Sequence, residues 1–178
     1  MDGINKGAGS DWTDLIGGVQ FTSSGATSMQ DSYYFSSSSY LNKFNGWDTG
    51  SDDFTVEVCY YYTGSNSIYS VFGFGGGASS KYPLFYKGGN YITWIQGGYL
   101  YDCSSFQTNS KYTVSLNNTR GLVNGNSISI LSSTDYWSTG SEMRIGKLAG
   151  GGAANYPFNG YIYSIRIYNR RLSQAEQL

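Results

Sequence analysis

Residues 158–168 read Phe-Asn-Gly-Tyr-Ile-Tyr-Ser-Ile-Arg-Ile-Tyr, and from Tyr161 onward they have the composition of a β-strand. Residues of this β-branched and aromatic kind suit a pleated, half-buried surface. Successive side chains of a strand point to opposite faces. We therefore expect one face of the strand to carry Tyr161, Tyr163, Ile165 and Ile167.

The same stretch resembles the closing strand of laminin-G-like domains in the concanavalin A-like lectin/glucanase superfamily. The resemblance rests on residues 158–162 (Phe-Asn-Gly-Tyr-Ile), 165–170 (Ile-Arg-Ile-Tyr-Asn-Arg) and 172–176 (Leu-Ser-Gln-Ala-Glu). In the last of these, Ser173 and Glu176 form a capping-box pattern, which predicts at most one turn of helix. Family members often carry acidic residues where this chain has Tyr163 and Ser164.

Further motifs of this family follow one another in the expected order along the chain. They are an opening Trp-x-Asp-Leu-x-Gly at 12–17, a strand–turn–strand at 33–41, a core strand Phe-Thr-Val-Glu at 54–57 and a Val-Asn-Gly turn at 123–125. The core strand continues through Cys59, where tryptophan is usual in the family. Asn124-Gly125 between apolar runs is also a strong hairpin signal by itself. The resemblance implies a two-sheet antiparallel jelly-roll sandwich of the concanavalin A-like type.

The spacing of strands and turns leads to the same fold class without the resemblance. Other strand-like runs lie at 69–74, 91–96, 99–101, 111–116 and 143–146. Turn residues separate such runs every 8–12 residues or so, which is typical of an all-β sandwich. Gly97-Gly98 lies between two of them and predicts a hairpin. We therefore predict an all-β sandwich in which residues 1–178 form a single domain.

Composition and charge exclude several classes of partner. The formal net charge is −1 and charged residues make up 13% of the chain, against roughly 25% in typical soluble domains. Without a basic stripe we expect no nucleic acid, and without an apolar run near 20 residues we expect no membrane insertion. Residues 1–6 lack the apolar segment of a signal peptide. We expect either an excised domain or a protein released by lysis, as virion proteins are.

The residues available for catalysis are few. Histidine is absent, which removes the usual general base and the commonest metal ligand. Glucanases of this fold carry Glu-x-Asp-x-x-Glu on one strand, and none of the glutamates Glu57, Glu142 and Glu176 has that neighbourhood. The sequence therefore predicts that the protein is not an enzyme. Cys59 and Cys103 either form one disulfide or pack as two thiols, and we favour the thiols.

Aromatic residues make up 17% of the chain, and their abundance is the most informative feature of the composition for function. Tyrosine and tryptophan offer large, rigid contact area with a polar tip, and their flat rings suit the apolar face of a sugar. The predicted ligand-binding residues are Trp94, Tyr99 and Tyr101 around the Gly97-Gly98 turn, with Tyr136 and Trp137 in a Ser/Thr/Gly loop. The alternative is that such rings build the core, and Tyr136-Trp137 has the best claim to exposure.

One loop offers oxygen ligands of the kind that calcium prefers. Asp48, Asp52 and Asp53 lie there close to Asn45. The alternative is that these aspartates only keep a Ser/Gly loop solvated. Calcium is thus a possible ligand, and no other cofactor is predicted.

Three functions remain open from the sequence. The first is a non-catalytic module that attaches its carrier to glycans or another cell-surface ligand, displayed on a virion or an extracellular surface. The second is a virion structural component, such as a head-decoration or fibre domain, that contacts other virion proteins. The third is an accessory domain of a secreted multidomain glycosidase.

Overall fold

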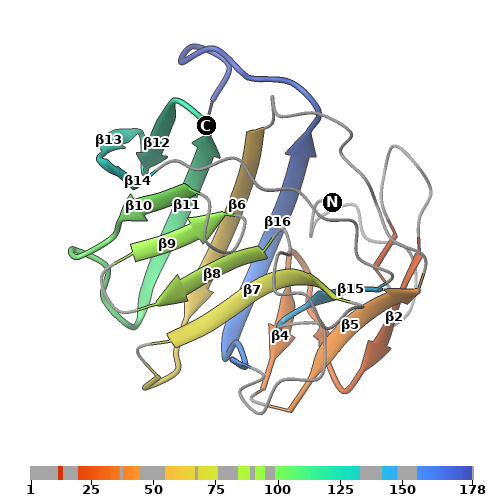
Figure 1. Ribbon diagram of the computed structural model, residues 1–178. Coiled ribbons are helices and arrows are strands. Elements are labelled where there is room, and N and C mark those ends of the chain that lie inside the picture. The colour runs from red at the N-terminus through yellow and green to blue at the C-terminus, as the bar shows by residue number, and fades with distance from the viewer. Residues whose placement is uncertain are drawn as a thin grey trace.

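The computed structural model describes residues 12–13, 20–36, 38–44, 55–66, 68–75, 84–88, 91–94, 99–132, 142–147 and 156–177. Within these ranges the chain consists of strands joined by turns and loops, and the strands form two layers (Figure 1). No helix able to cross a membrane occurs among the described residues.

The two layers are antiparallel sheets, which we call the back sheet and the front sheet. The back sheet has, in spatial order, β13 (Asn126–Ile128), β12 (Arg120–Val123), β11 (Ser110–Asn117), β6 (Thr55–Tyr62), β16 (Gly160–Tyr168), β4 (Tyr33–Phe35) and β3 (Thr27–Ser28). The front sheet has β1 (Trp12–Thr13), β2 (Gln20–Ser24), β5 (Tyr40–Phe44), β15 (Glu142–Ile145), β7 (Ile68–Gly75), β8 (Leu84–Gly88), β9 (Tyr91–Trp94), β10 (Tyr99–Asp102) and β14 (Ile130–Ser132). This arrangement confirms the predicted two-sheet antiparallel sandwich.

The core between the sheets is built largely from aromatic rings. The ring of Trp12 stacks on that of Tyr33, with centroids 4.8 Å apart. Phe158 meets Tyr60 edge to face at 5.9 Å. All of these side chains are fully buried. Large rings thus supply the apolar burial that leucine and valine supply in other sandwiches.

The central strand of the back sheet follows the predicted alternation. On β6, Val56, Val58, Tyr60 and Tyr62 point into the core. The predicted Asn-Gly hairpin also forms, joining β12 to β13 with φ of 49° at Asn124 and 79° at Gly125. Such left-handed values at both central residues match the twist of a two-residue hairpin. Strands β1, β2, β3 and β8 were not predicted.

Strand β16 exists as predicted. The prediction that Tyr161, Tyr163, Ile165 and Ile167 share one face of this strand is wrong. Its register with β6 passes from Ile162 opposite Tyr60 to Ser164 opposite Cys59, so that Tyr163 is the extra residue of a β-bulge. The extra residue shifts the alternation by one. Ile162 and Ile165 therefore both lie in the core, and Tyr161 and Tyr163 do not share a face with Ile165.

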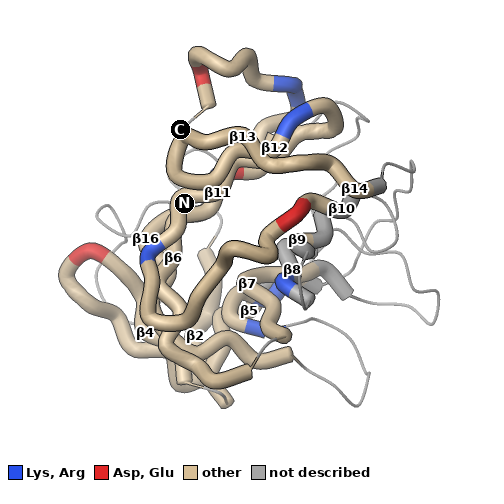
Figure 2. The backbone as a smooth tube through the Cα atoms, turned by 90° about the vertical axis from the view of Figure 1, so that its left-hand side faces the viewer, with Lys and Arg blue, Asp and Glu red and all other residues tan. Residues whose placement is uncertain are grey.

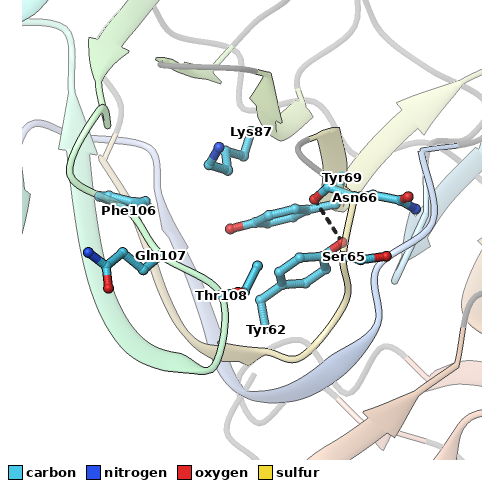
Figure 3. Close-up of a pocket in the computed structure, with 8 residues that line it drawn as sticks. All are labelled: Tyr62, Ser65, Asn66, Tyr69, Lys87, Phe106, Gln107 and Thr108. Carbon is cyan, nitrogen blue, oxygen red and sulfur yellow. Dashed lines mark hydrogen bonds between the residues drawn. The ribbon is translucent and has the colours of Figure 1, made fainter.

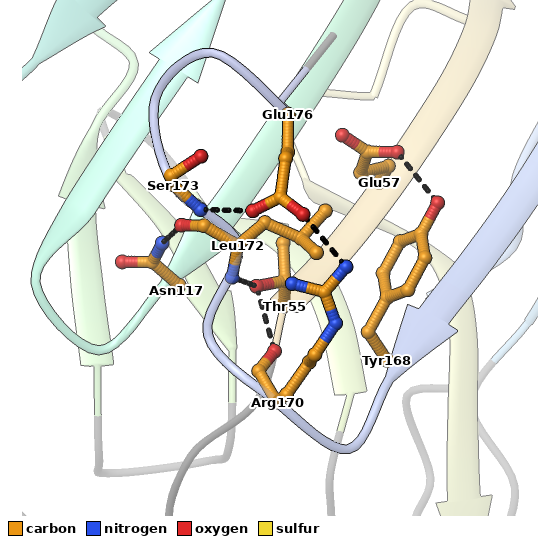
Figure 4. A network of polar contacts seen from close by, with 8 residues as sticks. All are labelled: Thr55, Glu57, Asn117, Tyr168, Arg170, Leu172, Ser173 and Glu176. Atoms are coloured by element: carbon orange, nitrogen blue, oxygen red, sulfur yellow. Dashed lines mark hydrogen bonds and ion pairs between the residues drawn. The ribbon is translucent and has the colours of Figure 1, made fainter.

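After β16 the chain turns back and is held against the back sheet by buried polar contacts (Figure 4). The hydroxyl of Thr55 donates to the carbonyl of Arg170 at 3.0 Å and accepts from the backbone N–H of Leu172 at 2.8 Å. The amide of Asn117 donates to the carbonyl of Leu172 at 3.2 Å. One half of the predicted capping box forms as well, because the N–H of Ser173 donates to the carboxylate of Glu176 at 2.9 Å, while the N–H of Glu176 donates to the Ser173 carbonyl at 3.1 Å.

The carboxylate of Glu57 lies under this returning segment. It is only 2% exposed and accepts hydrogen bonds from the hydroxyls of Ser115 and Tyr168, both at 3.2 Å. The guanidinium of Arg166 lies 4.0 Å away. Glu57 is thus enclosed by the chain's own polar groups, and this part of the back sheet is covered.

The two cysteines are free thiols, as we favoured from the sequence. Cys103 is buried, whereas Cys59 is half-buried on β6.

Candidate functional site

Three tyrosines lie side by side on the outer face of the back sheet, beyond the covered part. They are Tyr34 on β4, Tyr161 on β16 and Tyr61 on β6, and we call them the tyrosine row. Tyr161 is in register with both of its neighbours. Its ring centroid is 5.1 Å from that of Tyr34 and 6.3 Å from that of Tyr61.

The tyrosine row faces away from the core because of strand alternation. The chain neighbours of these tyrosines are buried, among them Tyr33, Tyr60 and Ile162. The row residues themselves are only half-buried, so each ring keeps some surface open to solvent. The result is a shallow aromatic platform three strands wide.

Polar residues extend the platform at both ends. Thr27 on β3 pairs with Tyr34, and Lys111 on β11 pairs with Tyr61. Both side chains are exposed. The ammonium of Lys111 lies 3.9 Å from the centroid of the Tyr163 ring, the bulge residue. Rings, hydroxyls and one ammonium thus occur together on this face.

A pocket of about 210 Å³ lies between the two sheets, beside the loop that joins β6 to β7 and the loop that leads to β11 (Figure 3). Tyr62 of β6 forms one wall, and Tyr69 of β7 and Lys87 of β8 come from the front sheet. Phe106 lies in the loop that leads to β11. Four polar residues complete the lining, namely Ser65, Asn66, Gln107 and Thr108.

Ring stacking fixes the walls of this pocket. The rings of Tyr62 and Tyr69 are stacked with centroids 3.9 Å apart, and Phe106 stacks on Tyr112 at 4.2 Å. The hydroxyl of Tyr62 donates to the carbonyl of Asn66 at 3.0 Å. Packed rings with few rotatable bonds give a largely preformed site.

Two ionisable groups beside the pocket, Tyr69 and Cys103, have raised pKa values. Burial raises the pKa of the Tyr69 phenol, whose oxygen lies 3.2 Å from that of Tyr60. Burial also raises the pKa of the Cys103 thiol to about 11, although the nearby charge of Lys87 lowers it. The Tyr69 phenol and the Cys103 thiol are therefore neutral near pH 7. Lys87 is nearly buried, with 9% of its surface exposed.

Charge is sparse over the rest of the described chain. Lysine, arginine and acidic residues lie scattered along the backbone (Figure 2). In the described ranges no group of three or more His, Cys, Asp or Glu residues lies close enough to hold a metal ion. The predicted calcium residues Asp48, Asp52 and Asp53 lie outside those ranges, so calcium there stays a prediction.

The structure places the predicted ligand-binding residues in different ways. Trp94 and Tyr99 pair across β9 and β10, which confirms a hairpin, although β9 ends at Trp94. Their side chains, and the whole of Tyr136 and Trp137, lie outside the described part of the chain. Tyr101 is fully buried, and its hydroxyl donates to the carbonyl of Asn117 at 2.8 Å. With no ring surface open to a ligand, Tyr101 is a core residue.

The residues of the tyrosine row were not singled out from the sequence. Each is flanked by other aromatic or β-branched residues, so composition does not mark it as different from the core. Strand alternation by itself predicts only that the side chains of Tyr34 and Tyr61 point to the face of the sheet opposite to that of their chain neighbours. Their approach to Tyr161 depends on which strands pair, and no local signal carries that information.

A third half-exposed aromatic site lies on the front sheet. Tyr40 of β5 faces away from the buried Leu41. The guanidinium carbon of Arg144 lies 5.1 Å and the ammonium of Lys147 4.2 Å from its ring centroid. The two cations cover this ring, which distinguishes it from the tyrosine row.

Comparison with known proteins identifies a matching family and several solved structures with a similar fold. A family model of laminin G type, described as "Concanavalin A-like lectin/glucanases superfamily", matches residues 30–176. No curated protein sequence matches the chain.

Solved structures resemble the fold at low sequence identity. Sialidase from Trypanosoma rangeli in complex with sialic acid is 15% identical with a TM-score of 0.65, over 96% of this chain and 30% of that one. The CBM40 module of Ruminococcus gnavus IT-sialidase, bound to α2,3-sialyllactose, is 17% identical with a TM-score of 0.57. That match covers 77% of this chain and 96% of the module. The chain thus spans under a third of the sialidase but nearly the whole of the binding module.

Proposed function

We propose that this chain, which belongs to the concanavalin A-like lectin/glucanase superfamily, is a non-catalytic glycan-binding module. The tyrosine row on the back sheet is the single observation that carries this proposal. The glycan lies along Tyr34, Tyr161 and Tyr61, with its sugar rings against the phenol rings.

The chemistry of the tyrosine row supports a carbohydrate ligand. A pyranose ring has an apolar face of C–H groups that packs on a flat aromatic ring, while its rim of hydroxyls needs hydrogen-bond partners. The tyrosines supply both the ring and a hydroxyl. Thr27 and Lys111 add exposed donors at the two ends. The centroid separations of 5.1 and 6.3 Å make a platform long enough for an oligosaccharide rather than one sugar.

The comparisons support the same class of ligand. The Ruminococcus gnavus module is similar over nearly its whole length and was solved with a sialylated sugar. At 17% identity this similarity establishes only the fold, and one fold hosts many functions. The ligand class is therefore argued from the tyrosine row.

A module attached to a glycosidase is the favoured setting among those left open by the sequence. The similar region makes up only 30% of the Trypanosoma rangeli sialidase chain. We therefore propose that the module holds a larger carrier on its glycan, as in the first sequence-based hypothesis, and that the carrier is a glycosidase, as in the third. A virion setting stays a prediction.

The test is a glycan array with two matched variants. We expect Tyr161→Ala to lose most of the array signal, because this residue contacts both other rings of the row. Tyr161→Phe should keep much of the signal, because the ring remains. Tyr40→Ala is the control, since Tyr40 is also a half-buried strand tyrosine but lies on the front sheet.

Thermal unfolding of each variant separates lost binding from lost folding. If the wild-type protein binds no glycan, the proposed function is wrong. If Tyr161→Ala binds as well as Tyr40→Ala, the ligand does not lie on the tyrosine row.

A further inference from the structure

We propose that the pocket between the sheets is a second sugar-binding site, which takes one uncharged monosaccharide ring, such as the terminal residue of a glycan. The proposal rests on the proposed function in that it takes the ligand to be a glycan. It adds a site apart from the tyrosine row, which lies on the outer face of the back sheet, and it names a class of sugar. Lys87 already interacts with other groups of the protein and takes no part in the binding.

Phe106 offers the sugar a flat apolar wall. One face of its ring stacks on Tyr112, with an angle of 5° between the rings and centroids 4.2 Å apart. The Phe106 side chain is only half-buried, and it lines the pocket. The stacking therefore fixes the ring while part of its surface stays open to a ligand. The C–H face of a pyranose packs on such a surface, as it does on the rings of the tyrosine row.

Four uncharged polar side chains surround this wall. Ser65 and Asn66 belong to the loop after β6, and Gln107 and Thr108 to the loop that leads to β11. All four residues are exposed, and their side chains make no hydrogen bond to another described residue. Hydroxyls and carboxamides both donate and accept, as sugar hydroxyls do. The rim thus suits a neutral polyhydroxylated ring rather than an ion.

The two loops are held in place by tyrosine side chains and backbone. The hydroxyl of Tyr62 donates to the carbonyl of Asn66 at 3.0 Å, and the N–H of Gln107 donates to the hydroxyl of Tyr112 at 2.7 Å. The N–H of Asn109 donates to the carbonyl of Tyr62 at 2.8 Å. The backbone is thus fixed while the polar side chains remain available. Less ordering is then needed when a ligand binds, which favours affinity.

The size of the pocket limits the ligand to one ring. Its volume of about 210 Å³ exceeds the roughly 150 Å³ of a cavity that holds benzene. It is below the roughly 300–1,000 Å³ of sites that enclose drug-sized molecules. In Figure 3, Phe106 and Gln107 lie on one side, Tyr62 and Tyr69 lie on the other, and Thr108 lies between them. A single sugar ring between these two sides is flanked by aromatic rings and lies close to the polar rim.

The experiment is an NMR titration of the full chain with the methyl glycosides of glucose, galactose, mannose, xylose and N-acetylglucosamine. Cyclohexanol, a six-membered ring with one hydroxyl, is the apolar comparison. We expect at least one glycoside to shift both the side-chain amide signals of Gln107 and the ring signals of Phe106. That glycoside should bind about tenfold or more tightly than cyclohexanol, since its additional hydroxyls make further hydrogen bonds.

Two variants test the rim and the wall. Gln107→Ala should weaken binding of that glycoside several-fold, up to about tenfold, as expected for one lost hydrogen bond. Gln174→Ala is the matched control and should change nothing, because Gln174 is also exposed but lies in the turn after β16. Phe106→Leu keeps an apolar side chain against Tyr112 but removes the flat ring, and it should weaken binding more than Gln107→Ala does. If Phe106→Leu does not fold, the exposed Gln107 still decides the test.

Each remaining outcome decides the matter. If no glycoside shifts the signals of Gln107 and Phe106, or if Gln107→Ala binds as well as Gln174→Ala, the proposal is overturned. Cyclohexanol binding as tightly as the best glycoside shows a merely apolar crevice and overturns the sugar assignment. Glycan-array binding that depends on Tyr161, without a shift at Phe106, leaves the proposed function standing and removes only this pocket. Glycoside binding at Phe106 without array binding on the tyrosine row has the opposite meaning.

Discussion

Replacing Thr55 with valine should detach the segment that follows β16 while leaving the volume of the core unchanged. The Thr55 side chain is fully buried and bonds to two backbone groups of that segment, the carbonyl of Arg170 and the N–H of Leu172. Valine has nearly the same shape as threonine but has a methyl group in place of the hydroxyl. The substitution therefore removes both hydrogen bonds without creating a cavity.

The size of the effect follows from what each freed group can do. Arg170 is exposed, so its carbonyl can bind water instead. Leu172 is buried, and its N–H loses its partner in a place that water does not reach. An unsatisfied buried donor costs about 1–3 kcal/mol. For a domain of this length a loss of about 2 kcal/mol lowers the melting temperature by roughly 4–8 °C.

Thermal and urea unfolding of Thr55→Val measure the loss, with Thr113→Val as the matched control. Thr113 lies on the adjacent strand β11, and its hydroxyl makes only a 3.6 Å contact with the sulfur of Cys59. We expect the control to change the unfolding free energy by less than about 0.5 kcal/mol. Trypsin should also cleave Thr55→Val faster after Arg170. Equal stability of the two variants would show that the hydroxyl does not hold the segment.

Two further predictions concern ionisable side chains. Cys103 is buried and the pKa of its thiol is raised to about 11, whereas Cys59 is half-buried. A thiol reagent at neutral pH should therefore label Cys59 quickly and Cys103 slowly. The variant Cys59→Ser should lose the fast phase of labelling. The guanidinium of Arg170 at 2.8 Å lowers the pKa of Glu176 to about 2. A carboxyl with a lowered folded-state pKa stabilises the fold above its ordinary pKa near 4.5, and this contribution is lost as the pH falls through about 2. Urea unfolding should therefore show Glu176→Gln less stable than wild type at pH 7, with the difference shrinking in acid.

The fold class could be predicted from the sequence because its signals are local. Residues 55–62 alternate, and Asn124-Gly125 needs only its own backbone angles to make a hairpin. The bulge at Tyr163 could not be predicted in the same way. It arises from how β16 pairs with β6, and one extra residue on a strand moves all later side chains to the other face.

The candidate sites were less accessible to sequence reasoning than the fold. Tyr101 lies beside a glycine turn, as a binding residue would, yet its hydroxyl has a buried partner and its ring fills the core. Lys87 has no unusual neighbours in the chain. Its place in the pocket depends on the rings of Tyr69, from the neighbouring strand, and of Tyr62, from the opposite sheet. Such convergence is a property of the pairing pattern rather than of any segment.

The tyrosine row joins parts of the chain that are remote from each other, since Tyr34, Tyr61 and Tyr161 come from its first, second and final thirds. Contacts between such distant segments form late, because the loops between them must close first. Under the proposed function, a fragment that lacks any one of these three strands lacks part of the binding face. Affinity for a carbohydrate would thus report that the whole domain has folded. A saturating concentration of oligosaccharide would slow the local unfolding of all three strands together.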